Sequence, residues 1–216
     1  MLSDDLRSRA EGIVERYPKG RERSALMPLL YLVQSVEGRV TREGMREVAD
    51  LLGLTMAEVE SVATFYTMLR LRPTGRHLIS VCTNLSCALR GANGVYEAAH
   101  RETGIPHGGE LSEDGLFSVH EEECLGACEG APVVQVDFAS HHRVTPERMR
   151  ELVERLRAGE VPTPDLGDAP ADFRHASRIL AGIDGAARPG ADGPGADDRG
   201  DGGADERGHE RTAAGS

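Results

Sequence analysis

Four cysteines stand in two close pairs, and the sequence contains no others. Four residues separate Cys82 from Cys87 in the segment VCTNLSC, and three separate Cys124 from Cys128 in EECLGACEGAP. Four thiolates that converge on one point repel one another strongly unless cations neutralise them. The two pairs therefore predict an iron–sulfur cluster, a structural zinc ion or two disulfides.

The spacing within the pairs favours a binuclear iron–sulfur cluster. Zinc sites usually take tighter C-x2-C pairs, because both ligands of a pair must hold one small tetrahedral ion. A binuclear cluster is wider, and each iron accepts two thiolates across a longer loop. Small residues around the second pair let backbone N–H groups donate to the sulfurs: Gly126, Ala127, Gly130 and Ala131. Zinc and disulfides stay open at this point, whereas the C-x-H and C-x-x-H pairs of a Rieske centre do not occur.

The segments that lead into the cysteine pairs have the patterns of strands. HLISVC (77–82) ends on the first cysteine, and LFSVHEEEC (116–124) alternates and again ends on a cysteine. Between them, CALRGANGVYEAAHRETG (87–104) predicts a helix that is open to interruption near Gly94. A helix and a returning strand fit between the pairs, so we expect the two cysteine loops to come together.

A further strand and a further helix complete this unit. PVVQVDF (132–138) is a β-branched run typical of a strand. Thr145 and Pro146 then open a helix that ends at Gly159. The order strand, helix, strand, strand, helix predicts an α/β domain over residues 73–159.

The region before this domain, residues 1–72, predicts a short helical bundle. Apolar residues recur at helical spacing in several segments that begin and end with capping signals. Gly38 follows one such segment as a stop, and Thr41 starts the next. The segment TMAE is a capping box in which Thr55 faces Glu58.

The region after the α/β domain, residues 160–216, predicts a Pro-, Gly- and Asp-rich linker and a disordered tail. From Gly185 onward the sequence has no Leu, Ile, Val, Met or aromatic residue, so it cannot bury enough apolar surface to offset the ordering of the chain. The segment FRHASRILAGI (173–183) is amphipathic and would dock on a partner or fray. We therefore expect the folded part to end near Gly159.

Composition argues against several classes of protein. The formal net charge of the 216 residues is −11, whereas a nucleic-acid binder needs a basic surface. The longest apolar run, ALMPLLYLV (25–33), is too short to span a membrane and contains a proline. The polar N-terminus lacks the apolar stretch of a signal peptide. We expect a cytoplasmic protein without direct membrane insertion, where paired cysteines more often hold metals than form disulfides.

Two further sequence patterns bear on this chemistry. The segment MREVADLLGLTMAEVESVATFY has helix-turn-helix rhythm, as a DNA-binding redox regulator would. Its second helix carries Glu58 and Glu60 but no Lys or Arg between Thr55 and Leu69, which leaves no donors for phosphates or bases. The sequence also has no G-x-G-x-x-G after a strand and no P-loop, so it offers no case for holding NADH itself.

Three longer segments resemble one known family. YPKGRERSALMPLLYLVQ, VATFYTMLRLRPTGRHLISVCTNLSCALRGA and ECLGACEGAPVVQV together are similar to the thioredoxin-like 2Fe–2S ferredoxin subunits of respiratory NADH dehydrogenase, complex I. The similarity spans about residues 10–158, in the family's order, with the C-x4-C and C-x3-C pairs at family-like separation. It implies a short N-terminal helical bundle followed by a thioredoxin-like α/β domain.

The resemblance also implies a function. Cys82, Cys87, Cys124 and Cys128 would bind one 2Fe–2S cluster, the first two on one iron and the last two on the other. The chain would be an electron-transfer subunit of an NADH-quinone oxidoreductase of the respiratory chain, not catalytic alone. It would exchange single electrons with FMN on a flavin-bearing partner subunit, which also binds NADH, and would join other peripheral-arm subunits at the inner face of the membrane.

Alternative assemblies stay open. Similar subunits serve NAD-linked hydrogenases and formate dehydrogenases, and a zinc-stabilised interaction module is a third possibility.

Around the second cysteine pair, we expect His120 to be exposed or to face a partner. Glu121 to Glu123 would lower the reduction potential of a nearby cluster, or form an exposed acidic strand end with little effect.

Overall fold

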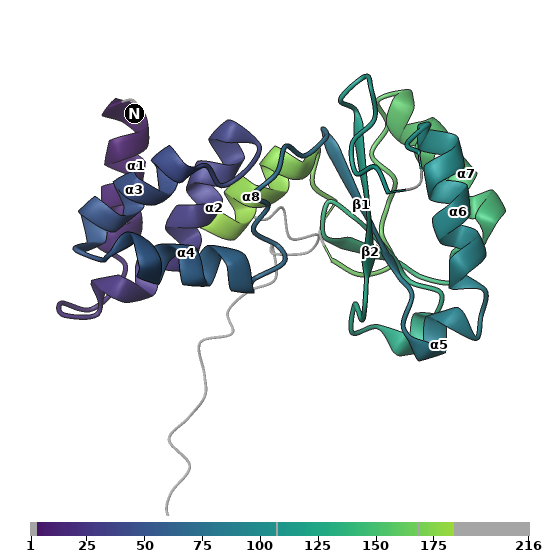
Figure 1. Ribbon diagram of the computed structural model, residues 1–216, viewed down its shortest axis with the longest axis horizontal. Coiled ribbons are helices and arrows are strands. Elements are labelled where there is room, and N and C mark those ends of the chain that lie inside the picture. Colours follow the sequence, from purple (N-terminus) through teal and green to yellow (C-terminus); the bar gives the residue numbers. More distant parts are fainter. Residues whose placement is uncertain (1–3, 107, 168, 184–216) are drawn as a thin grey trace, which may run out of the picture.

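The structure is a computed structural model that describes residues 4–106, 108–167 and 169–183 (Figure 1). The tail predicted from Gly185 onward lies outside these residues. The described helices and strands are α1 (Asp4–Val14), α2 (Leu26–Glu37), α3 (Arg42–Leu52), α4 (Met56–Phe65), β1 (His77–Cys82), α5 (Leu85–Ala88), α6 (Ala92–Thr103), β2 (Phe117–Glu122), β3 (Val134–Val136), β4 (Ala139–His141), α7 (Pro146–Arg157) and α8 (Phe173–Ala181), with 3-10 turns at Glu22–Ala25 and Cys128–Gly130.

Helices α1 to α4 form the predicted N-terminal helical bundle, and local capping signals set their ends. The Thr41 side chain accepts a hydrogen bond from the Gly44 backbone N–H at the start of α3. Thr55 and Glu58 form the predicted capping box at the start of α4, with both reciprocal bonds present. Gly38 ends α2 at φ 73°, a left-handed conformation that glycine adopts without steric cost.

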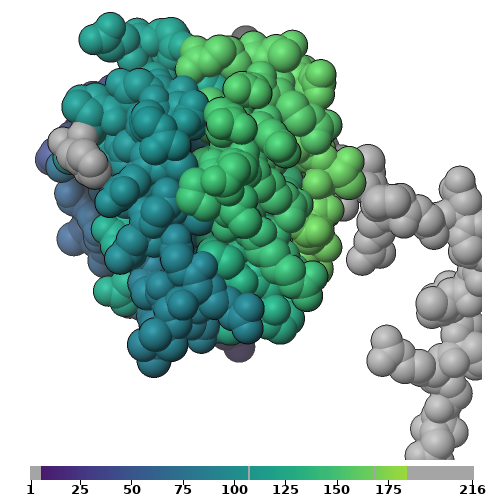
Figure 2. All heavy atoms as spheres, turned by 90° about the vertical axis from the view of Figure 1, so that its right-hand side faces the viewer, coloured from purple at the N-terminus to yellow at the C-terminus, as the bar shows by residue number. Residues whose placement is uncertain are grey.

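The second part of the chain is a sheet of mixed direction. Over the described residues it has four strands in the order β2-β1-β3-β4. Strands β1 and β2 are parallel, while β3 is antiparallel to both β1 and β4. Helices α6 and α7 cover one face of the sheet (Figure 1), and Figure 2 shows them side by side from that direction. The buried residues between sheet and helices include Ile79, Val81, Val95, Ala98, Phe117, Val119, Val134, Val136, Met149, Leu152 and Val153.

The opposite face of the sheet looks toward the helical bundle. Phe117 and Val119 point into the core under α6 and α7. Because side chains alternate along a strand, Ser118 and His120 point to the opposite face. Ser118 accepts a hydrogen bond from the Gly75 backbone N–H at 2.8 Å, and His120 contacts Arg70. The loop after α4 therefore lies against β2.

Helix α8 extends the folded part of the chain beyond the end expected from the sequence. The sequence places that end near Gly159, but α8 packs beside α2 (Figure 1). Phe173 is 1% exposed, and Ser177 is buried where it accepts a hydrogen bond from Gln34 Nε2 at 3.2 Å. The amphipathic segment thus docks within its own chain. The division into domains at residues 72–73 and 159–160 stays a prediction, and α8 packs with the helical bundle although it follows the α/β domain in sequence.

Several element boundaries also differ from those expected. The helix predicted over residues 87–104 is two helices, α5 and α6, and the break falls at Gly91, with φ 90°, and not near Gly94. The strand predicted over residues 132–138 is shorter, because the chain turns at Asp137 and Phe138 into β4. Both turn residues have positive φ, which few non-glycine residues adopt.

Candidate metal centre

The parallel pairing of β1 and β2 brings the two cysteine pairs to one edge of the sheet. Cys82 is the last residue of β1 and lies opposite Glu122, the last residue of β2, in the register of the two strands. Cys124 follows two residues later. Parallel strands end at the same edge, so both chain segments leave the sheet together. The Cys82 thiol lies 3.4 Å from the Glu123 carbonyl oxygen, to which it donates.

Two short helical turns present the second cysteine of each pair. The Asn84 side chain caps α5 by accepting from the Leu85 backbone N–H at 2.6 Å, and this turn carries Cys87. Cys128 begins the 3-10 turn that follows the second loop. Around the thiols, a small apolar cluster separate from the main cores is formed by Cys82, Cys87, Ala92, Leu125, Ala127, Ala131 and Val133.

All four cysteines are free thiols, and they differ in exposure. Cys82 and Cys87 are buried, whereas Cys124 and Cys128 are exposed. The site therefore has an inner pair shielded by protein and an outer pair open to solvent or to a partner. Disulfides, one of the three chemistries left open by the sequence, are not formed in this structure.

The four thiols interact across the two loops. Burial raises the pKa of the Cys87 thiol to about 11, the Val133 backbone N–H that donates to its sulfur lowers it, and neighbouring Cys82 and Cys128 raise it. The pKa of Cys128 is raised first by its hydrogen bond with Cys124. The thiols of Cys87 and Cys128 are thus harder to ionise, in part because other thiols are near, and bound cations would reverse this effect.

Two glycines shape the loop that carries the outer pair. Gly126 lies between the two cysteines with φ 75°, in the left-handed region. Gly130 follows Cys128, and a Cβ at this position would lie only 2.3 Å from Cγ of His142. Gly130 is therefore required by the close approach of His142 to the cysteine loop, whereas donation from its backbone N–H to a sulfur, the role expected for the small residues here, stays a prediction.

The donor set fits a thiolate-bound iron–sulfur cluster. It consists of four free thiols in two pairs, with a backbone N–H already donating to one sulfur. Over residues 4–106, 108–167 and 169–183, no three Cys, His, Asp or Glu side chains are gathered closely enough to form a ready site for one ion. The fit therefore rests on the two pairs and their mutual interactions.

A pocket of about 340 Å³ lies between the helical bundle and the exposed cysteine loop. Arg70 and Glu122 line this pocket together with Cys124. Arg70 Nη2 lies 2.7 Å from each ring nitrogen of His120, and Arg70 Nη1 lies 4.0 Å from a carboxylate oxygen of Glu122. Sequence patterns did not indicate this group, because its members come from separate elements.

The surroundings of His120 correct one expectation. The side chain is half-buried against Arg70 and is not the exposed imidazole that was one of the two expectations, while the other, that it faces a partner, stays a prediction. Burial, with the Arg70 charge as the next cause, lowers the pKa of His120 to about 4, so the ring is neutral near pH 7 and accepts from the guanidinium. Burial also raises the pKa of Glu122, while Arg70 lowers it.

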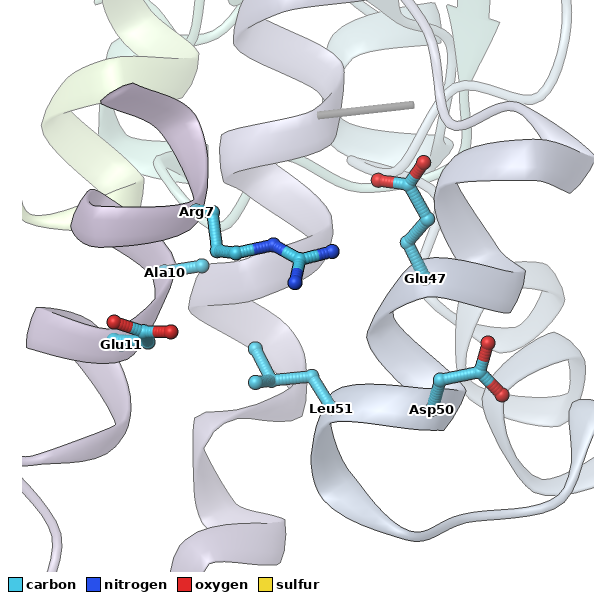
Figure 3. A pocket seen from close by; sticks show the side chains of 6 residues that line it. All are labelled: Arg7, Ala10, Glu11, Glu47, Asp50 and Leu51. Atoms are coloured by element: carbon cyan, nitrogen blue, oxygen red, sulfur yellow. The ribbon is translucent and has the colours of Figure 1, made fainter. Parts of the chain in front are cut away.

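Another hollow, of about 250 Å³, lies between α1 and α3, away from the cysteines. Figure 3 shows Arg7 extending from α1 toward the side of α3 that carries Glu47. Leu51 and Asp50 complete the α3 side of the hollow. Its lining contains no cysteine, so it is distinct from the candidate metal centre.

The fold and the site together define a class of protein. The sheet is of mixed direction, two helices cover one of its faces, and four free cysteines lie at or just beyond the ends of its parallel strand pair. These features define a thioredoxin-like α/β protein with four thiols grouped in two pairs. The model of the thioredoxin-like [2Fe-2S] ferredoxin family matches residues 10–157. The chain belongs to this family.

Similar proteins agree with this assignment. An NADH-quinone oxidoreductase subunit of Mycobacterium tuberculosis (strain ATCC 25618 / H37Rv) is 45% identical over 188 residues, which are 87% of this chain and 73% of that protein. NADH-quinone oxidoreductase subunit 2 of Thermus thermophilus is 42% identical over 158 residues, which are 73% of this chain and 87% of that protein. The resemblance to this family of NADH-quinone oxidoreductase subunits, inferred from three sequence segments, is confirmed.

A solved structure supports the fold. The air-oxidised NAD+-reducing [NiFe]-hydrogenase aligns with a TM-score of 0.54 at 20% identity, covering 62% of this chain and 23% of the hydrogenase chain. At this identity the likeness concerns the fold alone. The predicted combination of an N-terminal helical bundle and a thioredoxin-like α/β domain is confirmed. Within the described residues, none of the helices has both the length and the apolar character needed to cross a bilayer.

Proposed function

We propose that this chain is the 2Fe–2S electron-carrier subunit of an NADH-quinone oxidoreductase. The observation that carries the proposal is that two pairs of free thiols, one buried and one exposed, leave the same edge of the sheet and interact with each other. The family name and the similarity to two NADH-quinone oxidoreductase subunits support it.

Each cysteine has a role in the proposed cluster site. Cys82 and Cys87, the buried pair, would bind one iron, and Cys124 and Cys128, the exposed pair, would bind the other. The cluster would supply one-electron chemistry. The protein binds the cluster through these thiolates, donates to it from backbone N–H groups such as that of Val133, and shields its inner side with apolar residues.

The exposed half of the site suits electron exchange with a partner. The two outer cysteines are exposed, and so are Leu85 at 69% and Leu89 at 79% on and just after α5. Exposed apolar side chains beside a redox site are typical of a surface that a partner covers. We infer that this partner is the flavoprotein of the complex, with FMN and NADH bound there, and that other peripheral-arm subunits hold the chain at the cytoplasmic face of the membrane.

A second assembly uses the same chemistry. In an NAD-linked hydrogenase or formate dehydrogenase an equivalent subunit would also carry electrons from or to a flavin. The fold likeness to the NAD+-reducing hydrogenase fits this alternative, whereas the relatives above 40% identity favour the quinone-linked enzyme. A zinc-stabilised interaction module, the remaining alternative, predicts a colourless protein with bound zinc.

Reduction by NADH tests the carrier role. We expect NADH to leave the isolated chain oxidised and to reduce it when the co-purified flavoprotein partner is added, observed as bleaching of the visible absorption. Reduction of the isolated chain by NADH alone would contradict a division of labour between two subunits. The catalytic chain that co-purifies with the pair distinguishes the quinone-linked enzyme from a hydrogenase or formate dehydrogenase.

Ligand substitutions test the site assignment. Cys124→Ala or Cys128→Ala should abolish the visible absorption and the reduced-state paramagnetic signal, because one iron loses a thiolate. Ser80→Ala, a change of similar size on the neighbouring strand, should keep both signals. A Cys128→Ala protein with the full absorption and full signal would show that this residue is not a ligand.

A further inference from the structure

A partly buried cation lies across a pocket from one of the proposed ligands. Arg70 follows α4, and its side chain is only 16% exposed. It lines the same pocket of about 340 Å³ as Cys124. A guanidinium stays protonated in proteins, so this pocket wall has a fixed positive charge.

Hydrogen bonds from three directions fix the position of this charge. The Arg70 backbone N–H donates to Gln34 Oε1 at 2.7 Å, which ties the residue to α2. Its Nη1 donates to the Thr67 carbonyl oxygen at 3.3 Å, and its Nη2 donates to the His120 ring at 2.7 Å. These hydrogen bonds hold the guanidinium in one position relative to the pocket.

The charges around Arg70 offset its field only in part. The partly buried Glu122 carboxylate lies 4.0 Å from Arg70 Nη1 and opposes it, and Glu110 acts in the same sense but itself pairs with Arg72. His120 is neutral near pH 7. Glu121 and Glu123 are exposed, so water and salt screen their charges. A partly buried cation acts through a lower effective dielectric constant than these exposed carboxylates do.

We propose that Arg70 is an electrostatic tuning residue that raises the reduction potential of the cluster. The inference rests on the proposed function, because it requires a cluster at the cysteines. Adding an electron makes the cluster more negative, and a fixed nearby cation stabilises that reduced state relative to the oxidised one. Arg70 acts through its field and is not a ligand.

Redox titration of the full-length, cluster-loaded protein tests this role. Arg70→Gln removes the charge and keeps a hydrogen-bond donor. At the wild-type midpoint potential we expect the ratio of reduced to oxidised cluster to fall by about threefold or more, which is a shift of about 30 mV, since tenfold corresponds to about 59 mV for one electron. Arg70→Lys retains the charge and should stay close to the wild-type potential.

Arg72→Gln is the matched control. It removes the same charge from the same loop, but the Arg72 side chain is 80% exposed and pairs with Glu110 at 3.4 Å. Its potential should equal that of the wild type within repeat error. Equal shifts for Arg70→Gln and Arg72→Gln, or no shift for Arg70→Gln at full iron content, would overturn the proposal.

If Arg70→Gln does not retain its cluster, a second variant with an expected potential shift in the opposite direction tests the proposal. Glu122→Gln removes the carboxylate that opposes Arg70 in the same pocket, so it should raise the potential while Arg70→Lys leaves it unchanged. No change in Glu122→Gln, or a marked shift in Arg70→Lys, would then overturn the tuning role. Wild-type protein without iron or sulfide would instead overturn the proposed function, and the inference with it.

Discussion

At the scale of single residues, the loop that carries Cys128 depends on a position with no room for a side chain. A Cβ added to Gly130 would lie 2.3, 2.6 and 2.7 Å from Cγ, Nδ1 and Cβ of His142. Those atoms are close to the His142 backbone, so they cannot swing away as the end of a flexible side chain would. The Arg143 backbone N–H also donates to the Gly130 carbonyl oxygen at 2.6 Å, which holds the two segments together.

Gly130→Ala is therefore expected to displace the cysteine loop. We expect a loss of about 1–3 kcal/mol in the free energy of unfolding, as for other overpacked sites, together with reduced cluster content. Thermal unfolding and iron analysis measure the two effects. Gly12→Ala in α1, where a Cβ meets nothing within 4 Å, should instead stabilise the helix by about 0.5–1 kcal/mol. Wild-type stability and iron content in Gly130→Ala would contradict the close approach inferred at this position.

A buried histidine makes stability depend on pH. His141 is 1% exposed, and its Nδ1 has no hydrogen-bond partner within the part of the chain that the structure describes. Burial lowers the pKa of His141 from 6.5 to about 4, and the charges of Arg148 and others add to this. Between these two values the unfolded chain binds a proton that the folded chain does not, so stability falls as the pH falls.

His141→Leu should weaken this dependence. Each such proton contributes at most about 1.4 kcal/mol per pH unit to the slope of the unfolding free energy, and the variant lacks one of them. Urea unfolding between pH 5 and pH 6.5 measures the slopes. His120, whose pKa is lowered in the same window, contributes to both proteins, so the variant keeps part of the slope. Identical slopes in the two proteins would show that His141 charges freely in the folded state.

At the scale of elements, the structure shows which signals in the sequence are local and which are not. The start of α4 was predictable, because Thr55 and Glu58 satisfy each other within one turn. The turn into β4 was not predictable from local sequence. Asp137 has φ 50° because its carboxylate accepts from the Leu78 backbone N–H and pairs with His77 at 2.8 Å, contacts that lie about sixty residues away.

Helix α8 was missed as a folded element for a similar reason. Its nine residues are too few for a stable helix in isolation, so its stability comes from packing on α2 and on the sheet. Phe173 provides the contacts beside the sheet: its ring lies 5.8 Å from that of Phe138 in the turn between β3 and β4, and its backbone N–H donates to the carbonyl oxygen of Arg76, just before β1, at 2.9 Å.

Removing the Phe173 ring should loosen the whole helix. We expect Phe173→Ala to lower the free energy of unfolding by about 3–5 kcal/mol, because the ring is fully buried. Leu180→Ala on the same helix, where the side chain is 38% exposed, should cost clearly less. Chemical denaturation gives both values. Equal small losses would mean that α8 does not pack stably on the rest of the chain.

At the scale of the whole molecule, the helical bundle and the sheet are connected through polar contacts. Gln34 accepts from Arg70 and donates to the Met68 carbonyl oxygen and to Ser177 of α8, while Arg70 reaches His120 on β2. The bundle thereby contacts the strand that leads to the outer cysteines. This arrangement is the structural basis of the proposed tuning of the cluster by Arg70.

The cysteine residues of the site were predictable, and its electrostatic surroundings were not. The spacing of Cys82, Cys87, Cys124 and Cys128 is a local sequence pattern, and it is sufficient to predict two pairs of thiol ligands. The contact between Arg70 and His120 joins residues fifty positions apart, and no local pattern reports it. Charge in the sequence alone suggested an acidic strand end here, whereas the fold adds a partly buried cation.

The content of iron and acid-labile sulfide in anaerobically purified full-length protein tests the central claim most directly. We predict about two irons and about two sulfides per chain, because each cysteine pair holds one iron of a sulfide-bridged cluster. A protein that contains neither iron nor labile sulfide after reconstitution, or that holds zinc in their place, would contradict the cluster assignment.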